Sequence, residues 1–317
     1  MQRPPIFPPS PLARAAALAG LLTLVAVETT PAGAVTGPQR IIAGRPDQLL
    51  SSVNETYLIW TQNSESFANR FHAYGKLRRT TEPFRLNPAG TRGWTGGIDP
   101  DQDRAIYQQI HGQASDLYTI HLGTLRRIKL PSPINTTRWE WGPRISNAFY
   151  LFARDASLKT TLFLYDRSTK TMEKLVSLDL TRYYTVPGAV GERYATWSVC
   201  GPLNCSAFIR DTVTDETMKI PAPPGTTRYA PVVHEAEDMV YFARSGQTCG
   251  SVVRIMRLPV TDLGARPVGL VTLPTGVDVD FQMSLDEVGA DVDLWFSRYR
   301  CGPQQGDIYR LRGVGLG

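Results

Sequence analysis

Four arginines recur along the chain at a nearly constant spacing and could together bind an anion. Each follows a threonine, and the pairs are Thr91-Arg92, Thr137-Arg138, Thr181-Arg182 and Thr227-Arg228. Successive arginines are separated by 46, 44 and 46 residues, Arg45 continues the series upstream, and Asp278 occupies the next position downstream. Guanidinium groups bind carboxylates through paired hydrogen bonds, so a ring of arginines at a channel mouth could bind an anionic ligand. The favoured alternative is that each arginine links one repeat to the next, because a feature found in every repeat usually stabilises the repeat.

A cluster of aspartates resembles the start of a calcium loop but does not complete one. The cluster is Asp99-Pro-Asp101-Gln-Asp103. A calcium loop of the EF-hand type needs glycine at its sixth position and an acid at its twelfth, where this chain has Arg104 and Ile110. A solvated turn is the favoured interpretation, because aspartate is common in turns.

The remaining candidates for metal binding or catalysis are also incomplete. His234-Glu235 begins like the motif of zinc proteases, but the second histidine is missing. Four aspartates near the end of the chain are interpreted as turn residues, although a channel could present some of them to a cation: Asp278, Asp280, Asp291 and Asp293. The chain has only 4 histidines and no Gly-x-Ser-x-Gly sequence. We therefore predict no catalytic residue, no metal and no cofactor.

Residues 1–34 have the pattern of a secretory signal peptide. Arg3 and Arg14 give a basic start, an apolar run extends from Ala15 to Val27, and Ala32-Gly33-Ala34 forms a small-residue cleavage site. The run is shorter than the roughly 20 residues that a helix needs to span a bilayer, which disfavours a retained membrane anchor. We expect a secreted or otherwise extracytoplasmic protein that is not embedded in a membrane.

The charge of the chain argues against nucleic acid as a partner. The net charge is +5 over 317 residues. The lysines and arginines form no block longer than two or three residues, and no stretch interleaves them with aromatic residues in the manner of a nucleic-acid groove. Mild and dispersed basicity favours solubility and points only weakly to anionic partners.

A repeat of about 45 residues predicts an all-β propeller. Each unit carries short runs rich in β-branched and aromatic residues, such as Phe149–Phe152 and Leu162–Tyr165, with turn residues between them. Four such runs per unit describe a propeller blade, and a β-sandwich or a solenoid is the alternative. We predict six four-stranded antiparallel blades within residues 35–317, at roughly 45–90, 91–135, 136–180, 181–225, 226–275 and 276–317. An N-terminal strand at residues 38–43 is expected to complete the last blade.

Four cysteines lie in the part of the chain expected to be exported: Cys200, Cys205, Cys249 and Cys301. An even number in an oxidising compartment suggests two disulfides, for which three pairings exist. Cys200 and Cys205 flank one tight hairpin, and the other two occupy the corresponding hairpin of neighbouring repeats. This phase favours Cys200–Cys205 with Cys249–Cys301. A metal site is disfavoured, because no histidine is near in sequence.

The last repeat resembles the TolB-type propeller repeat. Its segments Phe281-Gln-Met-Ser-Leu-Asp286, Val292-Asp-Leu-Trp-Phe-Ser297 and Gly306-Asp-Ile-Tyr-Arg-Leu311 are similar to that repeat's Ser-Pro-Asp-Gly turn, Phe-Ser strand and Gly-x-Asp-Ile-Tyr strand. Leu285 and Glu287 replace the proline and glycine of the turn, and the other repeats are degenerate. The resemblance implies an exported, six-bladed TolB-like propeller with repeats of the PD40 or WD40-like kind.

The resemblance also implies a binding scaffold, although the fold alone does not fix function. We predict a protein without catalytic activity, a monomer, that binds an envelope or secreted protein or a small anionic ligand. The alternative is a propeller hydrolase or lactonase with an acidic, metal-dependent site at the channel mouth. A purely structural extracellular protein is a third interpretation.

Overall fold

Strands and turns make up the part of the chain that the structure describes. The computed structural model describes residues 37–43, 47–63, 71–202, 204–246, 251–288, 291–300 and 306–315. These residues form twenty-four β-strands and two short 3-10 turns, Glu235–Glu237 and Val260–Asp262. Among them no helix is long and apolar enough to cross a membrane. The all-β class predicted from the repeat is confirmed.

The described strands form five hydrogen-bonded sheets, four of which contain four strands each. In spatial order these are β2(Gln48–Val53), β3(Tyr57–Asn63), β4(Phe71–Leu77) and β5(Phe84–Arg85); β14(Tyr184–Val190), β15(Tyr194–Cys200), β16(Cys205–Asp211) and β17(Glu216–Lys219); β18(Thr227–His234), β19(Met239–Ser245), β20(Arg254–Pro259) and β21(Val268–Thr272); and β22(Val277–Val288), β23(Asp291–Arg300), β24(Gly306–Leu311) and β1(Gln39–Ile42). The fifth sheet contains β6(Arg92–Ile98), β7(Arg104–His111), β8(Ala114–His121), β9(Arg126–Lys129), β10(Trp139–Ile145), β11(Phe149–Ala156), β12(Lys159–Asp166) and β13(Met172–Asp179).

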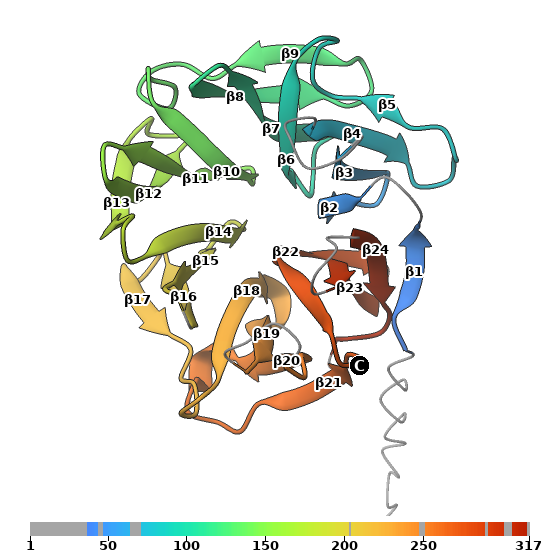
Figure 1. The fold of residues 1–317 in the computed structure, drawn as a ribbon, viewed down its shortest axis with the longest axis vertical. Helices are drawn as coiled ribbons and strands as arrows, with labels where there is room; N and C mark the ends of the chain where they lie inside the picture. Colours follow the sequence, from blue (N-terminus) through green and yellow to red (C-terminus); the bar gives the residue numbers. More distant parts are fainter. Residues whose placement is uncertain are drawn as a thin grey trace, which may run out of the picture. The chain divides into compact units, whose positions relative to one another are not determined.

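The sheets are arranged around a common centre like the blades of a propeller (Figure 1). The strands β2, β6, β10, β14, β18 and β22 lie innermost, and the strands that follow each of them along the chain lead outward. Contacts between neighbouring inner strands, such as β2 with β22 and β6 with β10, close the ring. The predicted propeller arrangement is therefore confirmed.

The number of separate blades differs from the prediction. Four separate four-stranded sheets are present where six were predicted, because β6 to β13 belong to one eight-stranded sheet. Within that sheet, β8 and β10 form a parallel pair at Ser115 and Trp139. Ser115 makes the link, since its backbone N–H donates to the Arg138 carbonyl at 3.4 Å and its hydroxyl to the Glu140 carbonyl at 2.5 Å. These bonds join two antiparallel groups that the repeat would otherwise keep apart.

The N-terminal strand completes the sheet of the last repeat, as predicted. Strand β1 pairs antiparallel with β24, with Gln39 opposite Arg310 and Ile42 opposite Ile308. Arg40 adds an ion pair to Asp307 at 3.1 Å. An unpaired strand exposes a row of backbone donors and acceptors. Strand β1, from the N-terminal end of the described residues, covers the edge of β24 near the C-terminal end.

Each inner strand carries a β-bulge at a similar position along its length. A bulge leaves backbone N–H groups without a strand partner, and these donors need other acceptors. Side chains from neighbouring strands supply them: Ile98 N–H donates to Ser52 Oγ at 3.1 Å, and Ala189 N–H to Thr196 Oγ1 at 2.9 Å. The inner strands come so close here that a Cβ on Gly96 would lie 2.1 Å from the Pro143 carbonyl oxygen.

Apolar side chains fill the spaces between neighbouring sheets. Tyr241, Val279 and Phe296 are fully buried in one such layer between the last two sheets. A disulfide links Cys200 to Cys205 at the β15–β16 hairpin, which confirms the first predicted pairing. The predicted pair Cys249–Cys301, Arg45 and the predicted signal peptide at 1–34 lie outside the described residues.

Candidate ligand site at one end of the channel

A cavity of about 590 Å³ lies on the axis where all the inner strands meet. Strands β2, β6, β14, β18 and β22 contribute their C-terminal halves, and most also contribute the turns that follow. Strand β10 contributes Arg144 and Ile145. The volume is within the range of small-molecule sites, roughly 300–1,000 Å³. The cavity is the strongest candidate for a functional site in the described part of the chain.

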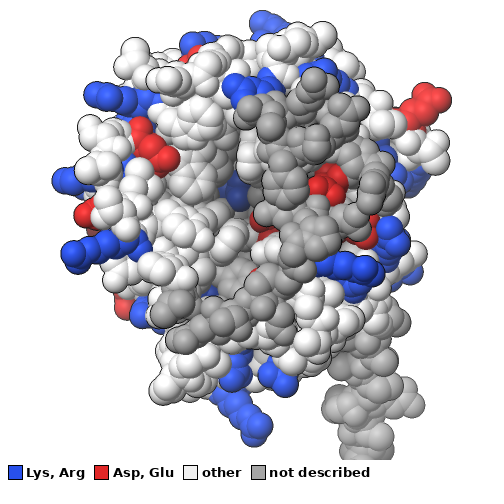
Figure 2. Space-filling model, in the orientation of Figure 1, with Lys and Arg blue, Asp and Glu red and all other residues white. Residues whose placement is uncertain are grey.

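The mouth of the cavity is rich in carboxylates. Seven acidic residues line the cavity as a whole: Glu55, Asp101, Asp103, Glu192, Glu235, Asp286 and Glu287. The basic residues that line it are Arg144 and His234. Figure 2 shows lysine and arginine side chains spread around the margin of one face of the molecule, with no single continuous basic patch on it. The acidic mouth therefore contrasts with the basic net charge of the chain.

Arg144 lies in the deep part of the cavity and is almost completely buried, with 4% of its surface exposed. Its guanidinium donates from Nε to the Gly188 carbonyl at 2.6 Å, from Nη1 to the Pro143 carbonyl at 2.8 Å and from Nη2 to the Pro187 carbonyl at 2.8 Å. The bulge of β14 directs two of these carbonyls inward. Burial lowers the pKa of Arg144 to about 9, against a smaller opposing effect of Asp280. The protein thus holds a cation that is solvated mainly by backbone carbonyls.

Gln282 lines the same cavity as Arg144 and comes from the bulge of β22. Its amide nitrogen donates to the Gly96 carbonyl at 2.7 Å, so the amide spans the channel from β22 to β6. This bond fixes the orientation of the amide, because a carbonyl can only accept. The Oε1 atom is buried and has no hydrogen-bond partner among the described residues. A buried acceptor without a partner is unusual and needs an explanation.

Two acidic groups of the mouth are held by neighbours. Asp286 is buried and pairs with Arg78 at 2.8 Å. Burial raises the pKa of the Asp286 carboxyl, while Arg78 opposes that rise. His234 lies between Glu237 at 3.2 Å and Glu287 at 3.0 Å. The Glu287 side chain is 66% exposed and therefore remains accessible to a partner.

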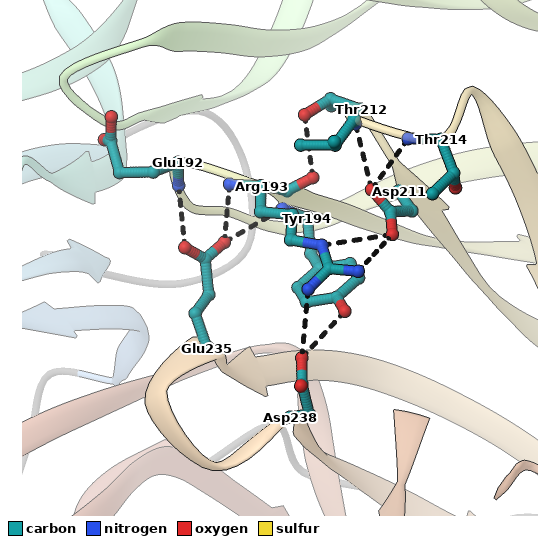
Figure 3. A network of polar contacts seen from close by, with 9 residues as sticks. Glu192, Arg193, Tyr194, Asp211, Thr212, Thr214, Glu235 and Asp238 are labelled. Atoms are coloured by element: carbon teal, nitrogen blue, oxygen red, sulfur yellow. Dashed lines mark hydrogen bonds and ion pairs between the residues drawn. The ribbon is translucent and has the colours of Figure 1, made fainter. Parts of the chain in front are cut away.

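A network of polar contacts links two neighbouring sheets beside the mouth (Figure 3). The Glu235 carboxylate accepts backbone N–H groups of Glu192, Arg193 and Tyr194 at 2.8–3.1 Å. Arg193 in turn donates to Asp211 Oδ2 at 2.7 Å from Nη2 and at 3.1 Å from Nε. The hydrogen bond from Arg193, with further backbone donors, lowers the pKa of Asp211 to about 2. The network fixes the position of the β14–β15 turn, which carries Glu192 and Gly191 of the mouth.

The predicted arginines lie at the opposite end of the inner strands. Arg92 is the first residue of β6 and is half-buried, whereas Arg138 and Arg182 precede β10 and β14 and are exposed. Arg228 in β18 is buried, with its guanidinium 4.7 Å from the centre of the Phe242 ring. Burial, aided by Arg244, lowers the pKa of Arg228 to about 10. Asp278 accepts a hydrogen bond from the Tyr229 hydroxyl. None of these five residues lines the cavity, and anion binding by them stays a prediction.

Asp99, Asp101 and Asp103, whose sequence resembles the start of a calcium loop, occupy the turn between β6 and β7. Asp99 pairs with Arg167 at 3.3 Å, and Asp101 accepts from the Asn147 amide at 2.5 Å. In the last sheet, Asp293 pairs with Arg310, and Asp280 accepts from the Phe281 backbone at 2.8 Å. Within the described ranges, no group of three or more histidine, cysteine or acidic side chains is arranged to hold a metal ion.

The sequence contains a signal for Gln282, although it contains none for Arg144. Small or proline residues recur in the inner-strand bulges: Gly96-Gly97, Gly142-Pro143, Gly188-Ala189 and Ala230-Pro231. Asp280-Phe281-Gln282 stands in their place in the last repeat. A large polar side chain at a position where four other inner strands carry small or proline residues indicates a residue that projects into the channel.

Comparison with known proteins shows the fold. No family model and no curated protein sequence matches the chain. Solved structures do match: a putative TolB from Agrobacterium tumefaciens has 12% identity and a TM-score of 0.56, with 84% of this chain and 90% of that chain covered. TolB from Acinetobacter baumannii has 12% identity and a TM-score of 0.52, with 78% and 61% covered. This chain is therefore a β-propeller that resembles TolB in fold, and it spans less than two thirds of the Acinetobacter protein.

The comparisons contradict the prediction that the chain is not an enzyme. An oligogalacturonate lyase in complex with manganese has 10% identity and a TM-score of 0.50, with 81% of this chain and 85% of that chain covered. A protein with catalytic activity thus shares the arrangement on which that prediction relied. The prediction relied on the lack of a contiguous catalytic motif and on the fold, and neither decides whether a propeller has activity.

Proposed function

We propose that this protein binds a positively charged peptide segment of an envelope or secreted protein in the axial cavity. The observation that carries the proposal is the seven carboxylates that line the cavity, against one arginine and one histidine. Four of these acids, Glu55, Asp101, Glu192 and Glu287, are exposed to solvent. A cleft lined by one sign of charge concentrates the field and attracts partners of the opposite sign.

The proposal includes a six-bladed architecture and export from the cytoplasm. Two antiparallel four-stranded groups, β6–β9 and β10–β13, meet through one parallel pair, and counting them separately gives six blades. Export is supported by the signal-like N-terminus and by the Cys200–Cys205 disulfide. Disulfides persist mainly in oxidising compartments.

Fluorescence anisotropy with a labelled hexalysine peptide tests the proposal on the chain from residue 35 onward. We expect saturable binding that weakens with salt, because the Debye length falls from about 10 Å at 0.1 M to about 3 Å at 1 M. The double variant Glu55→Lys with Glu287→Lys should bind at least about tenfold more weakly, since two attractive charges become repulsive.

A matched control separates the cavity from the general surface. Glu173→Lys with Glu216→Lys changes the net charge equally on the exposed strands β13 and β17. These outer strands contribute nothing to the cavity. We expect the control to bind like the unaltered chain. Equal losses in both doubles, or no peptide binding at low salt, would reject the proposed function.

A further inference from the structure

The deep part of the cavity has hydrogen-bonding capacity that the described protein atoms do not use. Arg144 has five N–H groups, and three donate to backbone carbonyls. Two remain without a partner in the described part of the chain. Gln282 Oε1 is an acceptor that also has no partner there, on a side chain that is 1% exposed. Both side chains line the cavity.

The contacts place these groups at one level of the channel. Gln282 donates to the Gly96 carbonyl, and Gly96 is packed directly against the Pro143 carbonyl. Arg144 donates to that same carbonyl of Pro143. The unused donors and the unused acceptor therefore belong to one small region in the deep part of the cavity.

The buried charge of Arg144 has no carboxylate in direct contact within the described ranges, and the electrostatic effect of Asp280 on it is smaller than that of burial. Within the described ranges, Arg144 forms no ion pair, and its bonds are all to carbonyl oxygens. Burial lowers the pKa of Arg144, and Asp280 opposes that effect only in part. Removing a charged partner from a buried pair is strongly destabilising, so a buried cation of this kind gains from an arriving anion.

We infer that Arg144 and Gln282 bind the C-terminal end of the peptide, with Arg144 taking its carboxylate and Gln282 taking the last backbone N–H. This inference rests on the proposed function and deepens it by fixing which end of the ligand enters. The final residue of a peptide carries an acceptor pair and a donor a short distance apart, which matches the unused groups. Guanidinium and carboxylate form paired, charge-assisted hydrogen bonds.

The acidic mouth adds a second requirement. A carboxylate that enters the cavity passes seven acidic side chains, so an anion alone is repelled. Positive residues behind the terminus neutralise that field and stay at the level of Glu55, Glu192 and Glu287. The selected ligand thus has a free carboxylate at its end and lysines or arginines before it.

Two forms of one probe test the inference on the unaltered chain. Hexalysine with a free C-terminal carboxylate is compared with hexalysine amide by isothermal titration calorimetry. The amide carries one more net positive charge, so the acidic mouth alone would bind it more tightly. We expect the opposite: the free acid binds at least about tenfold more tightly, the size of a charged hydrogen bond gained in a buried site.

Two variants check the assigned atoms. Arg144→Gln removes the charge, and Gln282→Met removes the acceptor while keeping a similar length. Arg144→Gln should abolish the preference for the free acid. Gln282→Met should weaken both forms by about the same factor, because both carry the last N–H. Circular dichroism confirms that each variant is folded, and the comparison on the unaltered chain does not depend on either.

The outcomes separate the inference from the proposed function. Equal or tighter binding of the amide, with sensitivity to Glu55→Lys and Glu287→Lys intact, overturns the carboxylate inference and leaves the acidic mouth as a binding site. Absence of binding for both peptides rejects the proposed function as well. A preference for the free acid that survives in folded Arg144→Gln overturns the assignment to Arg144.

Discussion

At the scale of single residues, the chain places charged groups where backbone atoms stabilise them. Glu235 accepts three backbone N–H groups of the β14–β15 turn, and Arg144 donates to three backbone carbonyls. Such contacts leave no trace in residue spacing, because the partner is a backbone atom of any residue type. The sequence therefore predicted arginines in phase with the repeat and missed Arg144, which is six residues out of that phase.

Asp211 offers a test of how far these contacts stabilise the fold. Its Oδ1 accepts backbone N–H groups of Val213 and Thr214, and its Oδ2 pairs with Arg193. Asp211→Asn should lower the free energy of unfolding by about 1–2 kcal/mol at pH 7, because the charge-assisted bonds are lost. Urea unfolding followed by tryptophan fluorescence measures the change.

The pH dependence gives the sign of the Asp211 contribution. The Arg193 hydrogen bond depresses the pKa of Asp211 from 3.8 to about 2. A depressed pKa stabilises the fold above the unfolded value, and this contribution is lost as pH falls from about 4 towards 2. The difference between unaltered chain and Asp211→Asn should therefore shrink over that interval. A constant difference would mean that Asp211 acts through packing alone.

At the scale of strands and turns, the repeat spacing predicted more than the local pattern did. The recurrence of β6, β10, β14 and β18 along the chain followed from the Thr-Arg phase, and each pair lies near the start of one of these strands. The bulges were not predicted, since a bulge depends on contact with the neighbouring blade rather than on propensity. The reason for the small residues in the bulges is visible only in the structure, where Gly96 packs against the Pro143 carbonyl and Gly188 against the Pro231 carbonyl.

Gly96 tests the close approach of the inner strands. An alanine Cβ there would lie 2.1 Å from the Pro143 carbonyl oxygen and 2.9 Å from the Ile106 carbonyl oxygen. These carbonyl oxygens belong to the backbone and cannot rotate away as the end of a flexible side chain can. Gly96→Ala should therefore destabilise the fold by about 3 kcal/mol. Thermal unfolding followed by circular dichroism should show a midpoint lower by roughly 6–12 °C.

Gly264→Ala is the matched control for Gly96. A Cβ on Gly264 would meet Asp262 Oδ1 at 3.4 Å, which is ordinary contact on an exposed turn. We expect its midpoint to stay within about 2 °C of the unaltered chain, since surface substitutions usually change stability by less than about 0.5 kcal/mol. Similar losses in both variants would show that the loss comes from glycine replacement in general.

At the scale of the whole molecule, the sequence predicted the propeller and its closure but not the location of the candidate site. The fold follows from a repeat that every unit expresses, whereas the site follows from departures from the repeat. Gln282 replaces small residues, and the acids that line the cavity come from turns and from the end of β22, which differ between units. Function of this kind depends on how the ring brings unlike residues together, which a single repeat cannot reveal.

Closure by β1 is the property of the whole ring that is most directly testable. Strand β1 covers β24, and Ile41 and Ile42 pack against a core that includes Trp60, Trp295 and Ile308. A chain that begins at residue 44 loses these contacts, and a chain that begins at residue 37 keeps them. We expect the shorter chain to unfold at least about 5 °C lower, because about 2 kcal/mol of apolar burial and strand pairing is lost.

Loss of β1 should also change how the protein associates. The uncovered edge of β24 presents free backbone donors and acceptors that can pair with another strand. Size-exclusion chromatography should show concentration-dependent association for the chain from residue 44 only. A synthetic peptide of residues 37–43 should restore both the melting midpoint and the monomer, since it can add back as an edge strand. Identical melting of the two chains would show that β24 does not need β1, and closure would then rest on contacts between the inner strands.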